Sequence, residues 1–404
     1  MKLFSSETMP KNGANVTTQL QTAIDQAAAA SADHVVEVNY RGRLIIDKIV
    51  LRSGLHLVIS QGCTLKASGQ TDKYYSRPGP FERLNAAAGL KAVIAGVNIK
   101  DVTIRGGGVI DGNYQGFLLP EQPTVGSLKT GGYPRPELIY CQETQGLEIR
   151  DVTLLNVPFW TIHLAGCTAS VITHVTILND RRMPNTDGID IDRSRQTRIS
   201  HCLISTGDDA ICAKCTEETS QLGNCEDMQV SDCVLSSTSA AVKVGSNSFG
   251  DFRRLSFDHL TVLNSNRGLA IQLRDGGRAE HIRFSHCFVE TKRFSPNWWG
   301  RAEPIYLTVA KREAGSALST IANVTFENVT AEAENGIFVW APKPSLIAGL
   351  SFQHVLLMRR PVGEGAAGEY DLRPAAFPQL VQAPSQWLVG HGIRDDTLAA
   401  IQVE

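Results

Sequence analysis

Three aspartates in two glycine-marked turns are the residues of this chain best suited to chemistry. Asp187 lies within residues 185–188, and Asp208 and Asp209 follow Gly207 in a second turn. Hydrolysis of a glycosidic bond requires such a set, because one carboxyl group protonates the leaving oxygen while another activates water. Asp beside Gly also commonly shapes turns. Two turns in register, one of them with adjacent like charges, favour a catalytic role instead.

The strands that follow the two turns are expected to bring these carboxyl groups together. Residues 189–192 and 210–213 both alternate apolar residues with others, as strands do. Parallel strands stack roughly 4.8 Å apart. Asp187 and Asp209 are therefore predicted to lie on neighbouring strands, with Asp208 at the same end of a cleft. A diagonal between the strands can supply the roughly 6.5–9.5 Å that inverting hydrolases leave between carboxyl groups for water.

An internal repeat determines the predicted fold. A short sequence template, first seen at residues 147–154 and 172–177, recurs along the chain. The spacing between its copies is that of a solenoid repeat with some insertions. Its equivalent positions are Val152, Val175, Cys202, Cys233, Leu260, Cys287, Val329 and Val355. This repeat predicts an all-β parallel β-helix, with one coil per repeat and a buried column of stacked residues.

A second family of strands lies between the repeat positions and is expected to form the cleft wall. The residues predicted to point outward from it are His163, Asp190, Cys212, Lys243, Ala270, Tyr306 and Phe338. The residues at the starts of these strands are Trp160, Asp187, Asp209, Ala240, Arg267, Glu303 and Asn335. Polar and aromatic side chains gather in these columns, which favours a binding face over a plain solvent face.

The whole chain, residues 1–404, is interpreted as one β-helix domain. Residues 16–30 have a helical apolar period and are predicted to form a helix that caps the first coil. Residues 361–404 are interrupted by Gly and Pro and are predicted to be an irregular tail that caps or lies along the solenoid.

Composition limits the classes of function. Lys plus Arg number 39 and Asp plus Glu 41, so the charge balance gives no sign of nucleic-acid binding. No apolar run approaches the length that spans a membrane. The N-terminus lacks the apolar core of a signal peptide, and several of the nine Cys lie in strand patterns. Together these observations predict a cytoplasmic protein with reduced, buried thiols. The sequence assigns no oligomeric state.

The repeat and the turn motifs resemble glycoside hydrolase family 28, the polygalacturonase family, across about residues 40 to 360. Members carry Asn-Thr-Asp, Gly-Asp-Asp, Gly-His-Gly and Arg-Ile-Lys on successive coils. Residues 185–187 and 207–209 match the first two motifs. The resemblance implies a right-handed parallel β-helix, Asp208 as the general acid, and Asp187 and Asp209 as the groups that hold and activate water, with inversion. It also implies Asn185 as a site residue.

The other two family motifs are absent. Residues 239–241 are Ser-Ala-Ala in place of Gly-His-Gly, and residues 270–272 are Ala-Ile-Gln in place of Arg-Ile-Lys. In the family these basic residues are associated with the galacturonate carboxylate. Lys243, Arg267 and Arg274 lie nearby and are candidates for holding a carboxylate instead, with Gln272 beside them. The alternative is that the three basic residues are solvated charges at the rim.

The longest step of the repeat contains further candidates for binding substrate. The resemblance implies a substrate contact for Tyr306, and Glu303 precedes it in the same insertion. Trp298 and Trp299 suggest a platform for the apolar face of a sugar ring. The alternative for the two tryptophans is that they pin the inserted loop to the wall of the solenoid.

Metal sites are the weaker interpretation of the remaining motifs. Asp190 and Asp192 share the outward face with Asp187 and offer oxygen ligands to a hard cation. Cys212, Cys215 and Cys225 resemble half of a zinc site, but no second pair completes it. The family resemblance implies no metal, and we predict neither a metal nor another cofactor. His163 is interpreted as a structural residue.

The sequence therefore predicts an inverting glycoside hydrolase that acts on a pectin-like or other acidic oligosaccharide. The apparent lack of a secretion signal favours short imported oligosaccharides, and with them exo-action, the Trp298–Trp299 loop closing one end of the cleft. Three alternatives stay open: a glycosidase for a sugar other than galacturonate, a β-helix lyase in which Lys243 or Arg267 is central, and a carbohydrate-binding protein without activity.

Overall fold

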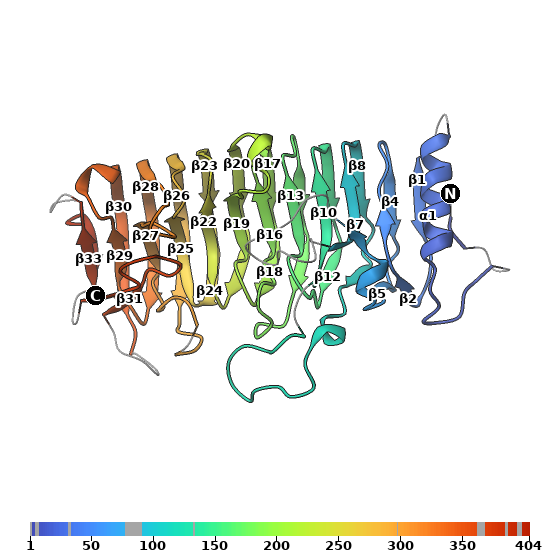
Figure 1. Ribbon diagram of the computed structural model, residues 1–404, viewed down its shortest axis with the longest axis horizontal. Coiled ribbons are helices and arrows are strands. Elements are labelled where there is room, and N and C mark those ends of the chain that lie inside the picture. The colour runs from blue at the N-terminus through green and yellow to red at the C-terminus, as the bar shows by residue number, and fades with distance from the viewer. Residues whose placement is uncertain are drawn as a thin grey trace.

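The computed structural model describes residues 2–4, 8–30, 34–76, 91–131, 134–296, 298–361, 368–383, 387–393 and 398–404. These residues form an elongated stack of parallel coils, with the N-terminal helix at one end and the C-terminal strands at the other (Figure 1). The all-β parallel β-helix expected from the repeat, and the right hand that the family resemblance implies, are confirmed. No helix within the described ranges is long and apolar enough to cross a membrane.

Two rows of strands run side by side along the stack and merge into one sheet at its C-terminal end. The first row is β1 (Val35–Val38), β4 (His56–Ile59), β8 (Lys100–Arg105), β11 (Gln145–Arg150), β14 (Val171–Thr173), β17 (Arg195–Ser200), β20 (Cys225–Ser231) and β23 (Phe252–Asp258). The second row is β2 (Gly42–Ile46), β5 (Cys63–Ala67), β9 (Val109–Asp111), β12 (Thr153–Leu155), β15 (Thr176–Leu178), β18 (Leu203–Thr206), β21 (Val234–Ser237) and β24 (Thr261–Ser265). The long strands that join the two rows are β26 (Arg278–Thr291), β28 (Thr320–Ala333) and β30 (Ile347–Arg359), and β34 (Ile401–Val403) pairs with β30.

A third row forms the remaining wall, called here the cleft sheet. Its strands are β3 (Ile49–Val50), β6 (Tyr75–Ser76), β7 (Lys91–Val97), β10 (Pro136–Gln142), β13 (Ile162–Ala165), β16 (Ile189–Asp192), β19 (Ile211–Cys215), β22 (Ala240–Ser248), β25 (Arg267–Leu273), β27 (Ile305–Val309), β29 (Ile337–Trp340) and β33 (Leu388–His391). The short elements outside the walls are β31 (Glu369–Asp371), β32 (Leu380–Gln382), η1 (Thr71–Lys73), η2 (Tyr114–Phe117), η3 (Ser220–Leu222) and η4 (Pro344–Leu346).

Residues of equal position on successive coils stack inside the solenoid, which makes one continuous core. Phe257, Phe284, Phe326 and Phe352 form such a column, with neighbouring ring centroids 4.8, 4.8 and 5.2 Å apart. The repeat positions predicted from the sequence are in register, as when Cys287 of β26 pairs with Val329 of β28. All nine cysteines are free thiols and are buried, as expected.

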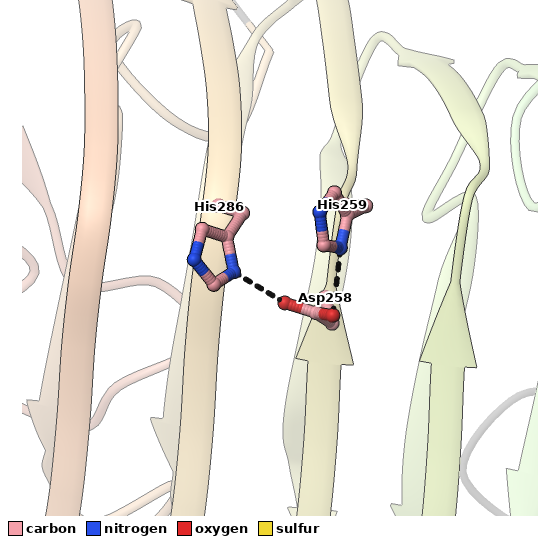
Figure 2. Close-up of side chains that lie close together, drawn as sticks. All are labelled: Asp258, His259 and His286. Carbon is pink, nitrogen blue, oxygen red and sulfur yellow. Dashed lines mark hydrogen bonds and ion pairs between the residues drawn. The ribbon is translucent and has the colours of Figure 1, made fainter.

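The turn before each repeat position has a left-handed backbone on coil after coil. The residues in it are Asp151, His174, His201, Asp232, His259, His286, Asn328 and His354, with φ between 49° and 54°. Two of these imidazoles, His259 and His286, stack 4.8 Å apart, and both hydrogen-bond Asp258 (Figure 2). The repeated turn therefore places polar side chains in a surface column.

The N-terminal helix is found where the sequence predicted it. Helix α1 (Thr17–Ala29) buries Leu20, Ala23, Ile24 and Ala27. It contacts β1 and β3 at the start of the stack (Figure 1). Burial of one apolar stripe against the first coil is what holds such a helix, and it covers an end that a solenoid must cap.

The prediction of an irregular tail at residues 361–404 is partly wrong. Strand β33 continues the cleft sheet beside β29, and β34 pairs with β30. Strands β31 and β32 form a small antiparallel pair. Glycine and proline interrupt these short strands, so the sequence pattern concealed them. The described part of this segment extends the stack, and residues 369–375 lie against the outer face of the cleft sheet.

Candidate active site

The two aspartate turns approach each other closely, and two glycines make this possible. A Cβ on Gly207 would lie 2.1 Å from the carbonyl oxygen of Met183, and one on Gly188 would lie 2.4 Å from that of Ala210. Thr186 Oγ1 accepts a hydrogen bond from the Gly207 N–H at 3.0 Å. The Gly188 N–H donates to the Asp209 carbonyl oxygen at 2.9 Å. The glycines of both motifs therefore lock one turn onto the next.

The outward column of the cleft sheet has the predicted register without exception. Asp190 pairs with His163 on one side and Cys212 on the other, and Cys212 pairs with Lys243. The column continues through Ala270, Tyr306 and Phe338. Asp187 and Asp209 consequently start neighbouring strands, as expected.

The structure brings the three carboxyl groups together. One oxygen each of Asp187, Asp208 and Asp209 lie within 4.8 Å of one another. The roughly 6.5–9.5 Å expected between carboxyl groups refers to whole groups, and it stays a prediction. The close approach follows from the glycine contacts, which draw the two turns together.

Two lysines hold two of the three aspartates. Lys214 Nζ lies 3.0 Å from Asp187 Oδ2 and 3.1 Å from Asp190 Oδ1. Lys243 Nζ lies 2.7 Å from Asp209 Oδ2. Lys243 was a predicted site residue, whereas Lys214 was missed. Alternation along the strand does place Lys214 outward, two residues beyond Cys212, and this was the available signal.

Asp208 differs from the other two because no ion pair of its side chain occurs among the described residues. Its Oδ2 accepts a long hydrogen bond from Asn185 Nδ2 at 3.4 Å. Its carbonyl oxygen is fixed by the hydroxyl groups of Thr206 and Ser237, at 2.5 and 2.7 Å. The backbone is thus held firmly while the carboxyl group remains without a cation.

The pKa values follow from these surroundings. Burial, with the nearby charges of Asp187 and Asp209, raises the pKa of Asp208 to about 8. Burial raises the pKa of Asp187 to about 8 as well, against the effect of Lys214. For Asp209, Lys243 and Lys214 outweigh burial and lower the pKa.

One proton is therefore shared by Asp187 and Asp208 near neutral pH, because two such close charges repel. The ammonium of Lys214 lies 3.0 Å from Asp187 and favours its ionised form. The proton accordingly belongs on Asp208. Asp187 Oδ1 is buried and has no hydrogen-bond partner within the described residues.

The residues in place of Gly-His-Gly serve Asp209. The Ser239 hydroxyl donates to Asp209 Oδ1 at 2.8 Å, and the Ala240 N–H donates to the same oxygen at 3.2 Å. With Lys243 on Oδ2, both oxygens of Asp209 are occupied. This chain thus keeps Asp209 ionised without a histidine.

A cavity of about 550 Å³ opens above the aspartates. It lies within the size range of small-molecule sites. Its lining consists of Trp160, Asn185, Asp187, Asp208, Asp209, Lys214, Glu218, Ser239, Lys243, Ser246, Asn247, Arg267, Gln272, Trp299, Arg312, Glu313, Arg373 and Pro374. Eight of the twelve predicted site residues belong to this lining, and the other four do not: Arg274, Trp298, Glu303 and Tyr306.

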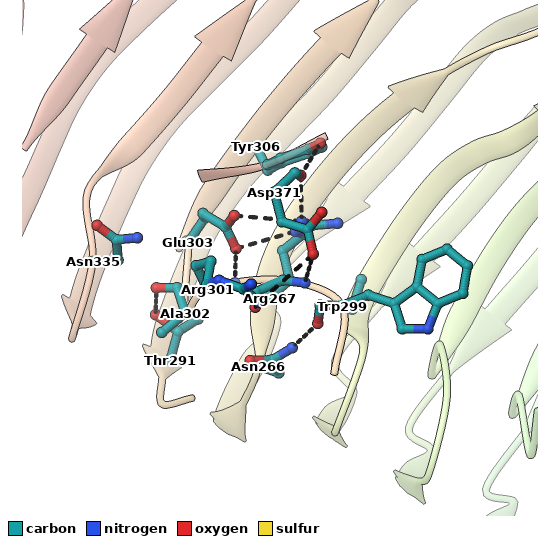
Figure 3. Close-up of polar contacts among 12 residues, drawn as sticks. Asn266, Arg267, Thr291, Trp299, Arg301, Ala302, Glu303, Tyr306, Asn335 and Asp371 are labelled. Carbon is teal, nitrogen blue, oxygen red and sulfur yellow. Dashed lines mark hydrogen bonds and ion pairs between the residues drawn. The ribbon is translucent and has the colours of Figure 1, made fainter. Parts of the chain in front are cut away.

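Tyr306 and Glu303 are fully buried against Arg267, which corrects their predicted contact with substrate (Figure 3). The Arg267 guanidinium lies 3.7 Å from the centroid of the Tyr306 ring, and its Nε donates to Glu303 at 3.2 Å. The Tyr306 hydroxyl donates to the Asp371 carbonyl oxygen at 2.7 Å. Tyr306 lies in the outward column as predicted, but Tyr370, Leu372 and Ala375 pack in one cluster with it. Glu303 is fully buried as well.

Arg274 and Trp298 are also structural. Arg274 is fully buried and donates to the carbonyl oxygens of Leu372 and Pro374, at 2.8 and 2.7 Å. It therefore holds the C-terminal segment instead of a substrate. Trp298 packs edge-on against Phe294. This contact agrees with the alternative prediction, in which a tryptophan holds the inserted loop in place. Trp299, in contrast, lines the cavity and is 44% exposed.

Two arginines of the cavity were missed. Arg312 follows β27, and Arg373 belongs to the C-terminal segment. Arg373 is brought to the cavity because Gln272 Nε2 donates to its carbonyl oxygen at 2.7 Å. Contacts between residues this far apart in the chain leave no local signal, so the sequence offered none for Arg373.

The weaker sequence candidates have structural partners. His163 is buried, with Nδ1 2.9 Å from Glu137 Oε1 and Nε2 3.4 Å from Asp192 Oδ2. Asp190, a candidate for a cation site, has the ammonium of Lys214 beside it. The three active-site aspartates are an oxygen set that suits a hard cation, but Lys214 and Lys243 already supply positive charge at those oxygens.

Comparison with known proteins identifies close resemblances. Residues 42–341 match the family model described as glycosyl hydrolases family 28. A probable polygalacturonase of Vitis vinifera is 35% identical over 52% of this chain and 44% of its own length, so less than half of that relative is matched. An endo-polygalacturonase of Pectobacterium parmentieri is 24% identical over 82% of this chain and 81% of its own length.

Solved structures have the same fold. The exopolygalacturonase of Thermotoga maritima superposes with a TM-score of 0.73 at 19% identity, covering 89% of this chain and 87% of that one. The polygalacturonase of Erwinia carotovora superposes with a TM-score of 0.67 at 21% identity, covering 88% and 95%. At such identities the likeness concerns the fold alone.

Proposed function

Because this chain belongs to glycosyl hydrolases family 28, we propose that it hydrolyses glycosidic bonds of a pectin-like or related acidic oligosaccharide. Inversion at the anomeric carbon and action from a chain end are parts of the same proposal. The observation that carries it is the unequal pairing of three aspartates, of which Asp187 and Asp209 are buried and Asp208 is partly exposed. Lys214 holds Asp187 and Lys243 holds Asp209, while Asp208 has no cation among the described contacts.

This unequal pairing gives the three aspartates different roles in hydrolysis. Asp208, protonated at neutral pH, gives its proton to the glycosidic oxygen as the bond from that oxygen to the anomeric carbon breaks. A water between Asp187 and Asp209 loses a proton to one of them, and its oxygen bonds the anomeric carbon from the opposite face. The proton taken up returns to solvent, and proton exchange restores the acid.

Inversion rests on the family resemblance. The nearest oxygens of the three aspartates lie within 4.8 Å of one another, and the wider separation of whole carboxyl groups that inversion requires stays a prediction. The two lysines favour inversion, because an aspartate held by an ammonium is a weaker nucleophile toward carbon. The NMR spectrum of the first product decides: the opposite anomeric configuration supports inversion, and the retained one overturns it.

Exo-action is supported by the closed ends of the cavity. On the C-terminal side, Ala270, Tyr306 and Phe338 are fully buried beneath Tyr370 and Leu372. On the other side, Tyr140 and His163 are buried as well. The outer face of the cleft sheet is therefore covered on both sides of the aspartates, whereas a polymer cut internally needs an open groove. Relatives named for each mode exist, since the Pectobacterium enzymes are endo-polygalacturonases and the Thermotoga enzyme is an exopolygalacturonase.

A glycosidase for a neutral sugar is the second candidate, and one observation favours it. Lys214, Lys243, Arg267, Arg312 and Arg373 line the cavity, and each has a carboxylate partner. A lyase is less well supported. Burial lowers the pKa of Lys243, but Asp209 outweighs this and raises it, so the ammonium is a poor base.

The test is product analysis with oligogalacturonides, rhamnogalacturonan fragments and neutral oligosaccharides, comparing the wild type with Asp208→Asn. Release of reducing ends from one substrate, lost in the variant, supports hydrolysis by Asp208. Absorbance of an unsaturated product indicates a lyase. Mixed internal fragments from a long polymer at early times contradict exo-action. Binding without turnover contradicts the enzyme and indicates a carbohydrate-binding protein.

A further inference from the structure

We propose that Trp299, Arg312 and Arg373 form a subsite for one carboxylate-bearing sugar unit beside the scissile bond. This inference rests on the proposed hydrolysis and names what the cavity recognises. The three residues come from three different segments: the inserted loop, the segment after β27 and the C-terminal segment. They meet at one wall of the cavity.

The cavity extends across these residues. A neighbouring hollow of about 260 Å³ is lined by Trp299, Arg312, Arg373, Pro374, Ala375 and Gln379. Four of these residues, namely Trp299, Arg312, Arg373 and Pro374, also line the cavity above the aspartates. The two hollows are thus adjoining, and a ligand whose reacting bond lies at Asp208 has space for a unit on this side.

Each guanidinium is fixed from behind and has one nitrogen left for a ligand. Arg312 donates through Nε and Nη2 to the two oxygens of buried Asp275, both at 2.8 Å. Arg373 donates through Nε and Nη2 to Asp371, at 2.9 and 2.7 Å. Within the described residues, the Nη1 group of neither arginine has a hydrogen-bond partner. Guanidinium groups held in this way are pre-oriented donors, the kind that carboxylates bind best.

Trp299 supplies an apolar surface at the same wall. Its backbone is held by Asn266, and the next residue, Gly300, donates its N–H to Asp371 Oδ2 at 3.0 Å. The indole extends away from this network, as Figure 3 shows, and remains 44% exposed. Indole faces pack on the apolar face of sugar rings. Asp371 therefore positions both Arg373 and the loop that carries Trp299.

The local sequence explains why the C-terminal segment can supply this wall. Ala270 is small and buried, which leaves space for Leu372 in the same cluster. Gln272 and Arg274 then bind the carbonyl oxygens of Arg373 and Pro374, both at 2.7 Å. Residues 270–274 of the cleft sheet thus hold a segment that brings its own arginine. A uronate unit fits this wall better than a neutral unit, because two charged donors face the cavity.

The test compares acidic substrates with their carboxyl-reduced analogues, which keep the ring and lose the charge. Charged hydrogen bonds contribute enough that Arg373→Gln and Arg312→Gln should each raise KM for the acidic substrate about 10- to 100-fold. The kcat should change little, and KM for the reduced analogue should not change. Trp299→Ala should raise KM for both substrates. The matched control is Arg254→Gln, because Arg254 pairs with Asp227 on the outer surface.

Equal KM changes for the acidic and the reduced substrate would overturn the subsite, because they indicate a general disturbance of the wall. If the wild type turns over neither, the proposed hydrolysis fails, and the subsite is then tested by binding alone. Calorimetry with digalacturonate should show affinity that Arg373→Gln weakens about 10-fold or more and that Arg254→Gln leaves unchanged. Binding that Arg373→Gln leaves unchanged would overturn the inference in that case as well.

Discussion

Two clusters of ionisable side chains in this solenoid have similar geometry and opposite surroundings. Asp187, Asp208 and Asp209 lie at the cleft sheet. Asp258 and His259 lie at the end of β23, and His286 lies on the neighbouring strand β26 (Figure 2). Within each cluster one polar atom of each residue lies within 4.8 Å of the others. The first cluster is largely buried, whereas His259 and His286 are exposed at the surface.

The two clusters shift the pKa of an aspartate in opposite directions. Burial and two neighbouring carboxylates raise the pKa of Asp208 to about 8. For Asp258, burial has a raising effect, but hydrogen bonds from Ser285, His286 and His259 outweigh it and lower the pKa to about 2. The stacked coils supply closeness in both places. The ability of an aspartate to act as an acid therefore depends on whether its cluster is buried and on whether its carboxyl group is paired with a cation.

The largest expected effect is the loss of the buried acid. Asp208→Asn keeps the shape and removes the proton donor, so kcat should fall about 10²- to 10⁴-fold on a substrate with a poor leaving group. The comparison variant, Asp258→Asn in the surface cluster, should keep wild-type kcat. Steady-state kinetics measures both. A similar kcat for Asp208→Asn and the wild type would remove the functional difference between the clusters.

Loss of the buried cation should have the next largest effect, on stability. Lys214→Met leaves Asp187 and Asp190 buried without their ammonium and should lower the free energy of unfolding by about 3–5 kcal/mol. Urea unfolding measures this change. Arg254→Met, which removes an exposed pair, should leave the free energy of unfolding near its wild-type value. Equal effects of the two substitutions would mean that the buried ion pairs of Lys214 stabilise the fold no more than the exposed ion pair of Arg254.

The dependence of kcat/KM on pH sharpens the comparison within the buried cluster. Activity should fall as pH rises through about 8, where Asp208 loses its proton, and should also fall at acid pH, where Asp209 becomes protonated. Since Lys243 lowers the pKa of both Asp209 and Asp208, Lys243→Gln should move the acid limb and the alkaline limb to higher pH. An acid limb that does not move would exclude Lys243 as the group that keeps Asp209 ionised.

The smallest effect is expected at the surface cluster. The folded-state pKa of Asp258 lies below its ordinary value, so its contribution to stability is present above about pH 4 and is lost as pH falls toward 2. Because the group is largely exposed, Asp258→Asn should cost less than about 1 kcal/mol at neutral pH. Unfolding of wild type and variant should converge at low pH. A difference that grows on acidification would contradict this assignment.

The sequence predicted the features that repeat from coil to coil, but few of the contacts between segments that are distant in the chain. The period of the repeat predicted the fold, and the alternation of residues predicted the register that joins Asp190, Cys212 and Lys243. The two motifs with aspartates were therefore placed correctly. Periodicity depends on residues close together in the chain, so it can be recognised in a single sequence.

Long-range cover explains the errors. Tyr306 and Arg274 point outward as alternation requires, but the segment around Leu372, much later in the chain, lies over them. Arg373 belongs to this same C-terminal segment, which brings it to the cavity. Lys214 was missed although alternation places it outward, and its long side chain reaches from its own coil to Asp187 on the preceding one. The cover by the C-terminal segment, in contrast, has no sequence period.

A carboxyl titration tests the central claim most directly, namely that burial makes Asp208 an acid at neutral pH. Carbon-13 NMR of protein labelled at aspartate carboxyl groups, compared with Asp208→Asn, isolates the Asp208 signal. The account predicts a midpoint of about 8 for this signal, against about 2 for Asp258. A midpoint near 4 for Asp208 would leave it ionised at neutral pH and would contradict its role as the proton donor.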